Sequence, residues 1–299
     1  MGMIIKFEVK TTTPMKLKTF LRNKKVSRRL LAKIRYGGGE ILVNQHSGRT
    51  IDKVNDGDIV SLQLPNEEFK QPIEASYVPI KILYEDDNFL VVDKPPFVAS
   101  IPSPLHRTDS MLNRVVGYYA LQQNKDIIPH VVSRLDRDTS GAMLFAKHRY
   151  AHALLDQQLQ NHLIKKYYTA ILTNRLNESH FSVNLPIDRK PGSLIKRAVL
   201  MDGKYSKTEY WVEKQIGDMA ICKIRLHTGR THQIRVHSAY IGHPLVSDTL
   251  YGGKIKMPLQ RQALHCSEIN FWDDFKERLI SVRSELPNTF NKLIQKGGK

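Results

Sequence analysis

The sequence predicts an α+β protein with a small N-terminal α/β domain and a larger domain. The larger domain is expected to form a mostly antiparallel mixed sheet with flanking helices. Two observations lead to this prediction. Two helical patterns followed by short strands open the chain, and the remainder is dominated by strand patterns with few helical ones. The 299 residues are also enough for two hydrophobic cores.

The N-terminal domain begins with a strongly basic segment. Residues 16–35 contain nine basic side chains and no acidic one. Apolar residues recur among these charges at helical spacing: Phe20, Leu21, Leu30, Leu31 and Ile34. This pattern favours two short helices over a disordered arm or a merely solvated charge run. Ser27 is a suitable N-cap for the second helix, and Gly37 is a suitable stop.

Short strands and a linker complete the first part of the chain. Residues 40–65 are typical of short strands separated by turns at 44–48 and 55–57. Residues 66–80 lack periodicity and contain two prolines, as linkers do. We therefore place one domain at 1–76 and a second at 77–299.

The second domain contains a series of strands interrupted by helices. Strands are expected at 80–84, 89–94, 141–148, 165–172, 208–215 and 219–228, the last two as a hairpin. Helices are expected at 149–163, with its apolar residues on one face, and from Thr231 to Ile241. Thr231 is a suitable cap for this last helix, and Gly242 would end it.

The charge of the chain points to a polyanionic partner. Lys+Arg 46 against Asp+Glu 29 gives a formal net charge of +17, which attracts nucleic acid and opposes self-association. An anionic membrane is the weaker alternative, because no stretch approaches the ~20 apolar residues of a spanning helix. The N-terminus lacks a signal-peptide pattern, and two cysteines cannot build a disulfide framework or a zinc site alone. We expect a cytoplasmic monomer.

The stretch "SRLDRDTSG" at 133–141 has two aspartates between two arginines. Asp136 and Asp138 would share a face of an extended segment and could hold a cation. The guanidinium groups of Arg134 and Arg137 compete for the same oxygens, which disfavours a metal site. A catalytic carboxylate and an arginine-paired turn both remain compatible with this spacing.

A second basic constellation lies at the expected helix start near residue 231. Arg230, His232 and Arg235 would surround a helix N-terminus, where backbone N–H groups favour anions. The histidines 227, 232 and 237 are five residues apart and share no helical or strand face, so a zinc cluster is not expected.

Two further side chains are candidates, each with an ordinary structural alternative. Lys94 precedes a double proline, which could form a rigid loop that carries it to a phosphate, or leave it on the surface. Tyr167 and Tyr168 point to opposite faces of a strand, so one could line a pocket while the other packs in the core. The chain has no glycine-rich phosphate loop and no dinucleotide or zinc-protease motif, which leaves binding alone or chemistry without a cofactor.

Taken in order, these segments resemble the RluA/RluD-type family of RNA pseudouridine synthases. The resemblance covers about residues 80–275. The N-terminal segments "VSRRLLAKIRYGGGEILVN" and "VNDGDIVSL" resemble the small RNA-binding domain named after ribosomal small-subunit protein four. The motifs of the larger domain are "LYEDDNFLVVDKPP", "SRLDRDTSGAMLFAK", "KKYYTAIL", "LHTGRTHQIRVHSAYIGHPLVSDTLYG" and "RQALHCSEINF".

The resemblance implies a catalytic aspartate at Asp136, a pocket tyrosine at Tyr168 and an arginine at Arg235 that pairs with the aspartate. Isomerising a flipped-out uridine adds no atom, so neither cofactor nor metal is implied. Asp136 would act as nucleophile or assist a glycal pathway, ionised through Arg235, and Tyr168 would remove the carbon-5 proton. Asp138 would hold the turn. The expected RNA contacts are Arg134, Arg137, Lys94, Arg230, His232, Lys24, Lys25, Arg28, Arg29 and Lys33.

The family resemblance leaves the RNA substrate open. Large-subunit ribosomal RNA is our first expectation because this two-domain architecture is common among enzymes that act there, and transfer RNA is the alternative. A catalytically inactive RNA-binding or ribosome-assembly factor is a second hypothesis, because Ser133 stands where many members have histidine. The intact Asp136, Tyr168 and Arg235 argue against it. Cys266, where alanine is frequent, is expected to be a small buried substitute.

Overall fold

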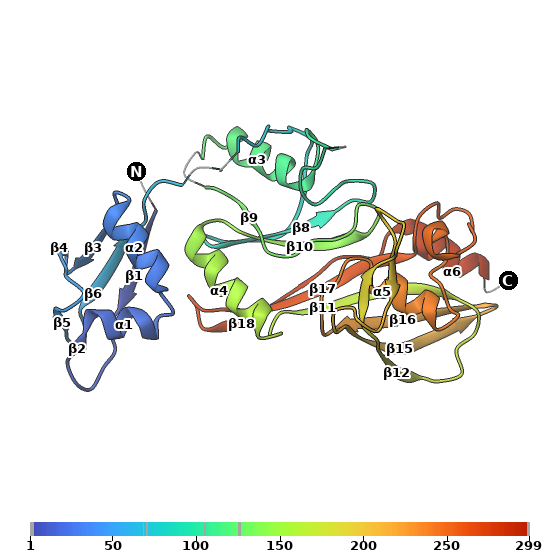
Figure 1. Ribbon diagram of the computed structural model, residues 1–299. Coiled ribbons are helices and arrows are strands. Elements are labelled where there is room, and N and C mark those ends of the chain that lie inside the picture. Colours follow the sequence, from blue (N-terminus) through green and yellow to red (C-terminus); the bar gives the residue numbers. More distant parts are fainter. Residues whose placement is uncertain (1–2, 68, 70, 105, 125–126, 298–299) are drawn as a thin grey trace.

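A four-stranded and a ten-stranded sheet organise the chain (Figure 1). The structure is a computed structural model, and it describes residues 3–297 except 68, 70, 105 and 125–126. Among these residues we find no helix whose length and apolar content would let it cross a lipid bilayer.

The four-stranded antiparallel sheet lies near the N-terminus in the order β1-β6-β3-β4. Two helices accompany it, α1 (Leu17–Asn23) and α2 (Arg28–Tyr36). The prediction of two basic helices is confirmed, and so is the cap: Ser27 Oγ accepts a hydrogen bond from Leu30 N at 3.1 Å. The strands are β1 (Ile4–Glu8), β2 (Met15–Lys16), β3 (Glu40–Val43), β4 (His46–Ser47), β5 (Lys53–Val54) and β6 (Ile59–Gln63).

The larger sheet has the central order β12-β15-β16-β11-β17-β10-β8-β7, with β18 on β17 and β9 on β10. In the described chain β10 and β17 pair in parallel and the other ladders are antiparallel, which confirms the mostly antiparallel mixed sheet. Its strands are β7 (Lys81–Glu85), β8 (Phe89–Lys94), β9 (His130–Val131), β10 (Ser140–Ala146), β11 (Lys165–Thr173), β12 (His180–Asn184), β15 (Lys207–Ile216), β16 (Met219–Leu226), β17 (Leu264–Asp273) and β18 (Arg278–Arg283).

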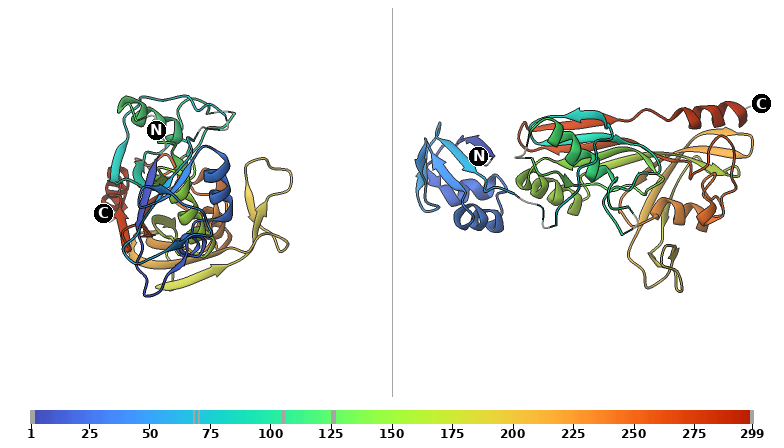
Figure 2. Two further views of the ribbon diagram at one scale, coloured as in Figure 1. Left: turned by 90° about the vertical axis from the view of Figure 1, so that its left-hand side faces the viewer. Right: turned by 90° about the horizontal axis from the view of Figure 1, so that it is seen from above.

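Helices and one separate hairpin flank this sheet. The helices are α3 (Met111–Leu121), α4 (Arg149–Gln160), α5 (Gln233–Tyr240), α6 (Asn288–Gly297) and the 3₁₀ turn η1 (Thr249–Tyr251). The hairpin of β13 (Ile187–Arg189) and β14 (Arg197–Val199), which the sequence did not predict, stands away from the body of the molecule (Figure 2). The sheet and its helices form the predicted α+β architecture.

The start of α5 differs from the prediction. The helix begins at Gln233, and its N-cap is His232, in a left-handed conformation with φ 58° and no capping side chain. Thr231 is therefore not the cap. The Gln233 side chain instead ties down the turn before the helix, because its Oε1 accepts from Thr228 Oγ1 at 2.7 Å and from Arg230 N at 3.0 Å. The expected stop at Gly242, with φ 83°, is confirmed.

The N-terminal sheet and the larger sheet meet through α4. Tyr150 and Leu154 of α4 pack into the hydrophobic core of the N-terminal part, and Tyr150 Oη donates to the carbonyl of Lys24. Glu67, in the connecting segment, accepts from the backbone N–H of Arg149 and contacts the ring of His130, both at 2.9 Å. The two parts are thus joined by packing as well as by the chain, while the boundary at 76 and 77 stays a prediction.

Candidate active site

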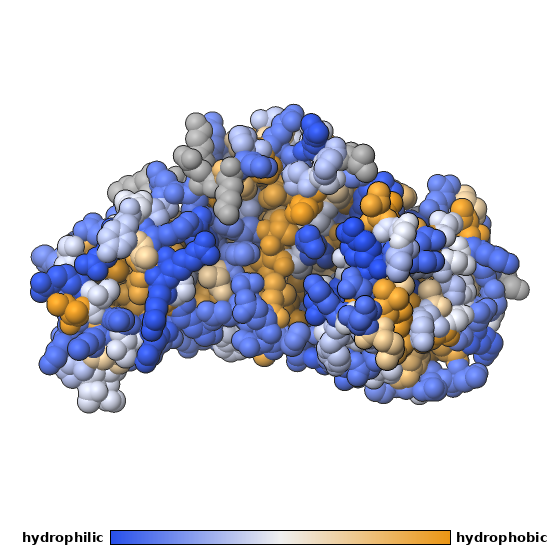
Figure 3. Space-filling model, in the orientation of Figure 1, coloured by the Kyte–Doolittle hydropathy of each residue, from blue (hydrophilic) through white to orange (hydrophobic). Residues whose placement is uncertain are grey.

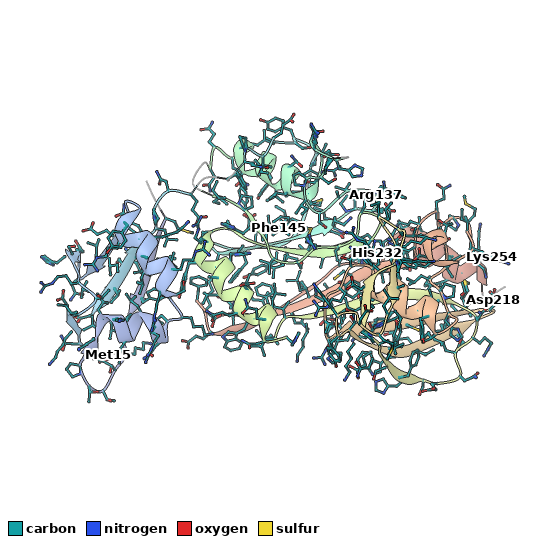
Figure 4. The ribbon with its side chains drawn as sticks, viewed as in Figure 1. Met15, Arg137, Phe145, Asp218, His232 and Lys254 are labelled. Carbon is teal, nitrogen blue, oxygen red and sulfur yellow. The ribbon has the colours of Figure 1, made fainter. Side chains whose placement is uncertain are left out.

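A pocket of about 530 Å³ is lined by residues of the central strands of the larger sheet, among them Leu226 of β16, Tyr168 of β11 and Leu264 of β17. Stretches that are distant in sequence contribute to it: the loop 132–137 before β10, Lys166 and Tyr168 on β11, residues 229–235 at the start of α5, and the segment 99–103. Figure 4 shows Arg137 and His232, from the first and third of these stretches, close to each other. The pocket brings together Asp136, Tyr168 and Arg235, which the sequence analysis had selected.

Arg235 lies between two carboxylates. It is buried at 7% exposure, and its Nε and Nη2 donate to Asp248 at 2.7 and 2.8 Å. Its third nitrogen, Nη1, lies 3.5 Å from Asp136 Oδ2. Burial opposes the charged form of Arg235, but the hydrogen bonds and charge of Asp248, together with Asp136, raise its pKa. A permanent cation is therefore aimed at the carboxylate of Asp136.

Sequence reasoning missed Asp248, although it lies within the quoted stretch "LVSDTLYG". Asp248 is 1% exposed and holds Arg235 in a two-pronged ion pair. In the sequence it is only an acidic residue after a turn, a pattern with many structural explanations. Tyr251 was also missed, because nothing in its local sequence indicates a specific role. Its ring lies 5.0 Å from the Arg235 guanidinium carbon, so it confines that side chain.

His232 was predicted to contact RNA, and the structure places it beside the catalytic candidate. Its Nε2 lies 3.9 Å from Asp136 Oδ2, and its Nδ1 is hydrogen-bonded to Tyr251 Oη at 2.9 Å. Burial lowers the pKa of His232 below its usual 6.5. The ring is then neutral at pH 7, so the cation that faces Asp136 at that pH is Arg235.

Tyr168, rather than Tyr167, faces the pocket. Tyr168 is 4% exposed and lines the cavity, whereas Tyr167 has the Lys223 ammonium 4.6 Å from its ring centroid. Burial, with contributions from Cys266 and Asp136, raises the pKa of Tyr168 well above its ordinary value of 10.0. Its hydroxyl therefore carries a proton at neutral pH. Lys166 lies on the same strand face two residues away, and burial lowers its pKa.

The prediction that Lys94 reaches RNA is wrong. Lys94 is fully buried, and its ammonium donates to the carbonyls of Pro95, Val98 and Arg137 at 2.9, 2.7 and 2.8 Å. Burial lowers its pKa to about 7. The chain turns at Pro96 and Phe97 directly after Lys94, the last residue of β8. Its role is to tie this turn to the loop that carries Asp136.

The neighbours of Asp136 divide into exposed and structural residues. Arg134 is exposed at the mouth of the pocket. Arg137 Nε donates to Asp138 at 2.7 Å, so this pair forms the salt-bridged turn that the sequence analysis had considered. Ser133, at 2% exposure, accepts a hydrogen bond from Leu144 N at 3.0 Å. Ser133 is thus a packing residue of the loop.

The remaining RNA-contact candidates lie in two places. Arg230 is exposed at the pocket, and its Nε donates to the Tyr205 carbonyl at 3.2 Å. On α2, three candidates are exposed: Arg28, Arg29 and Lys33. Lys25 forms a salt bridge with Asp274 of the larger domain, and Lys24 lies over the ring of Phe7. Lys25 therefore helps to join the two parts of the molecule, a role that the sequence analysis did not predict.

The described residues contain no group of three or more His, Cys, Asp or Glu side chains arranged to hold a metal ion. Cys222 and Cys266 are buried free thiols, and burial raises the pKa of each to about 12. Cys266 fits the expectation of a small buried residue.

The sequence and the fold agree with comparisons to known proteins. The sequence profile of the family described as RNA pseudouridylate synthase matches residues 88–240. An uncharacterised RNA pseudouridine synthase of Bacillus subtilis is 40% identical over 270 residues, which cover 90% of this chain and 95% of that protein. The ribosomal large subunit pseudouridine synthase D of Xanthomonas campestris is 31% identical over 271 residues, 86% of this chain and 80% of its own. The structure of human RNA pseudouridylate synthase domain containing 1 matches with a TM-score of 0.59 at 22% identity, over 76% of this chain and 97% of that one.

The chain belongs to the RNA pseudouridylate synthase family, whose members isomerise uridine to pseudouridine in RNA. Within that family it is of the RluA/RluD type, as the sequence motifs had indicated. The N-terminal resemblance to the small ribosomal-protein-four domain lies outside the matched residues and stays a prediction.

Proposed function

We propose that this enzyme isomerises a flipped-out uridine in large-subunit ribosomal RNA, with Asp136 as the essential group. The observation that carries the proposal is the placement of the Asp136 carboxylate in the pocket, 3.5 Å from a buried arginine that a second carboxylate holds in place. Such an arrangement orients a carboxylate toward bound substrate.

The chemistry proposed for the pocket uses only the chain's own residues. Asp136 either attacks the anomeric carbon as the bond to N1 of the uracil breaks, or removes the carbon-2′ proton to form a glycal. The uracil turns, and carbon 5 bonds to the sugar, which releases the Asp136 carboxylate or takes back the carbon-2′ proton. Overall, carbon 5 loses a proton and N1 gains one. The carbon-5 proton must then leave, and the candidate to receive it is Tyr168, which lines the pocket. Because Tyr168 is protonated at neutral pH, it accepts this proton only if its own hydroxyl proton moves on in the same step.

Basic side chains on both parts of the molecule support an RNA substrate that spans them. Arg134 and Arg230 are exposed at the pocket, and Arg28, Arg29 and Lys33 are exposed on α2. Figure 3 shows strongly hydrophilic side chains over α2 and around the pocket, with apolar side chains gathered between them. We propose that the phosphate backbone contacts both basic regions while the target base leaves the stack and enters the pocket.

The assignment to ribosomal RNA is supported by relatives named ribosomal large subunit pseudouridine synthase D. Transfer RNA is the alternative substrate. Mapping pseudouridines in total RNA from cells with and without the gene tests the choice. We expect loss of one or more sites in large-subunit ribosomal RNA, whereas loss confined to transfer RNA would contradict it. We further propose that the enzyme is cytoplasmic and that, because its charge of +17 opposes self-association, it acts as a monomer.

The hypothesis of an inactive RNA-binding factor is tested directly. Purified protein is incubated with unmodified ribosomal RNA transcript, and pseudouridine is measured in the product. The proposal predicts stoichiometric conversion at a defined uridine. Binding without any conversion, in ribosomal and transfer RNA alike, would favour the inactive factor.

A further inference from the structure

Arg261, in the segment before β17, lies outside the matched family profile and is not among the residues that line the active-site pocket. Its side chain is buried at 5% exposure. Nη1 donates to the carbonyls of Asp138 and Leu264, both at 3.0 Å, and to that of Gln262 at 3.2 Å. Nη2 donates to Ser140 Oγ at 2.8 Å. One side chain thus connects β17 to the loop that follows Asp136.

All four of these acceptors are neutral oxygens. Burying a charged guanidinium among neutral groups costs free energy. Its charge-assisted hydrogen bonds offset this cost and hold the acceptor groups in place. Burial accordingly lowers the pKa of Arg261 to about 10, which still leaves it charged at pH 7. The ring of Phe290 lies 5.3 Å from its guanidinium carbon and closes the far side.

The segment that Arg261 holds has little freedom in the structure. Thr139 N donates to the carbonyl of Asp136 at 3.1 Å, and Gln262 Nε2 donates to Thr139 Oγ1 at 3.3 Å. Gly141 has φ 114°, and a Cβ there would stand 2.2 Å from the carbonyl oxygen of Cys266, so β10 approaches β17 closely. Asp136 therefore sits at the start of a short, tied segment.

We propose that Arg261 is a positioning residue: it fixes residues 138–140 against β17 so that the Asp136 carboxylate faces Arg235 and the substrate. This inference rests on the proposed role of Asp136. Arg261 does not line the pocket among the described residues, so it acts through the loop rather than on RNA.

The test compares full-length Arg261→Gln and Arg261→Lys with the wild type in single-turnover reactions at saturating enzyme. Misplacing a reacting group by about 1 Å costs roughly 100-fold in rate. We expect about this loss of rate for Arg261→Gln, with unchanged RNA affinity. Arg261→Lys keeps the charge but cannot reach four acceptors, so it should recover only part of the rate. Arg283→Gln is the matched control, because Arg283 is exposed on the neighbouring strand and pairs with Glu268.

Several outcomes overturn the inference. A wild-type rate for Arg261→Gln would do so, and so would a loss of RNA affinity equal to the loss of rate, which would indicate a general structural role. If Arg261→Gln does not fold, Ser140→Ala decides: it removes one acceptor and should slow the chemistry at unchanged affinity, whereas a wild-type rate rejects the proposal. Wild type and Asp136→Asn run in parallel, so an inactive wild type or an active Asp136→Asn identifies failure of the proposed function instead.

Discussion

Arg235 interacts with two carboxylates, and it is much closer to one of them than to the other. Asp248 receives two short hydrogen bonds and is almost fully buried, while Asp136 lies 3.5 Å away and is partly open to the pocket. The tighter pair fixes the guanidinium plane, and the looser contact leaves Asp136 free to meet a substrate. Orientation of one charged group by another in a low-dielectric site is a common source of catalytic precision.

We therefore predict that Asp248→Asn reduces the rate of isomerisation without weakening RNA binding. The change leaves a buried arginine without its closest counter-charge, so the free energy of unfolding should fall by about 3 kcal/mol. Single-turnover rates and urea denaturation measure the two effects. Asp218→Asn is the control, since its pair with Lys256 lies at the surface and is worth about 1 kcal/mol or less. Full rate and stability in Asp248→Asn would contradict this reading of Arg235.

Tyr168 and Tyr167 provide an internal comparison. We predict that Tyr168→Phe slows isomerisation at least about 100-fold, because the proposed mechanism passes the carbon-5 proton to its hydroxyl. Tyr167→Phe should retain most of the rate. Because the pKa of Tyr168 lies above 10.0, its ionisation should produce no rise in rate between pH 7 and 9. Equal effects of the two substitutions, or such a rise, would contradict the assignment.

The three residues that the sequence selected and that line one pocket, Asp136, Tyr168 and Arg235, are all carried by ordered motifs. The sequence did not show which charged side chains would be buried. Lys94 was expected to reach a phosphate, yet its ammonium ends on three carbonyls. Asp248 and Arg261 gain their roles only when β10, α5 and β17 come together, so no local pattern marks them.

Among the elements, α2 combines a good cap with an exposed basic face. Ser27 caps the helix, Leu30 and Ile34 are buried beneath it, and Arg28 and Arg29 face outward. Local signals of this kind made the two helices and the β15–β16 hairpin predictable. The β13–β14 hairpin has only three residues in each strand, too few for a pattern.

If α2 holds RNA phosphates, removing its charges should change the salt dependence of binding. We predict that Arg28→Gln/Arg29→Gln lowers the slope of log affinity against log salt by about 1 to 2, through lost counterion release. Lys292→Gln/Lys296→Gln on α6 removes the same charge from another exposed surface and should leave the slope nearly unchanged. Equal slopes for the two double variants would indicate that α2 does not contact RNA.

On the scale of the whole molecule, the core contains histidines that are held neutral. Burial lowers the pKa of His148 and of His265 to about 4. His148 caps α4 with its Nδ1 and bonds Asn88 with its Nε2 at 3.0 Å. Unfolding exposes both rings, which then titrate near 6.5. Between pH 6.5 and 4 the unfolded chain binds more protons, so stability falls as the pH falls.

We predict that the free energy of unfolding decreases between pH 6.5 and 4, by about 1.4 kcal/mol per pH unit for each such histidine. His148→Asn should remove the contribution of one histidine, about 1.4 kcal/mol per pH unit, from this slope. Asparagine can replace the capping nitrogen without titrating. Urea denaturation at several pH values measures it, with the exposed His46→Asn as the control. Stability that stays constant or rises over this range would show that the buried rings are not held neutral.

The central claim is that this enzyme converts uridine to pseudouridine through Asp136. The most direct measurement compares Asp136→Asn with Asp138→Asn, two residues away, in single-turnover reactions on the same RNA. We predict no detectable pseudouridine from Asp136→Asn, with folding and RNA affinity retained, and substantial conversion by Asp138→Asn, whose carboxylate pairs with Arg137. Substantial turnover by Asp136→Asn, at a rate near that of the wild type, would contradict the account.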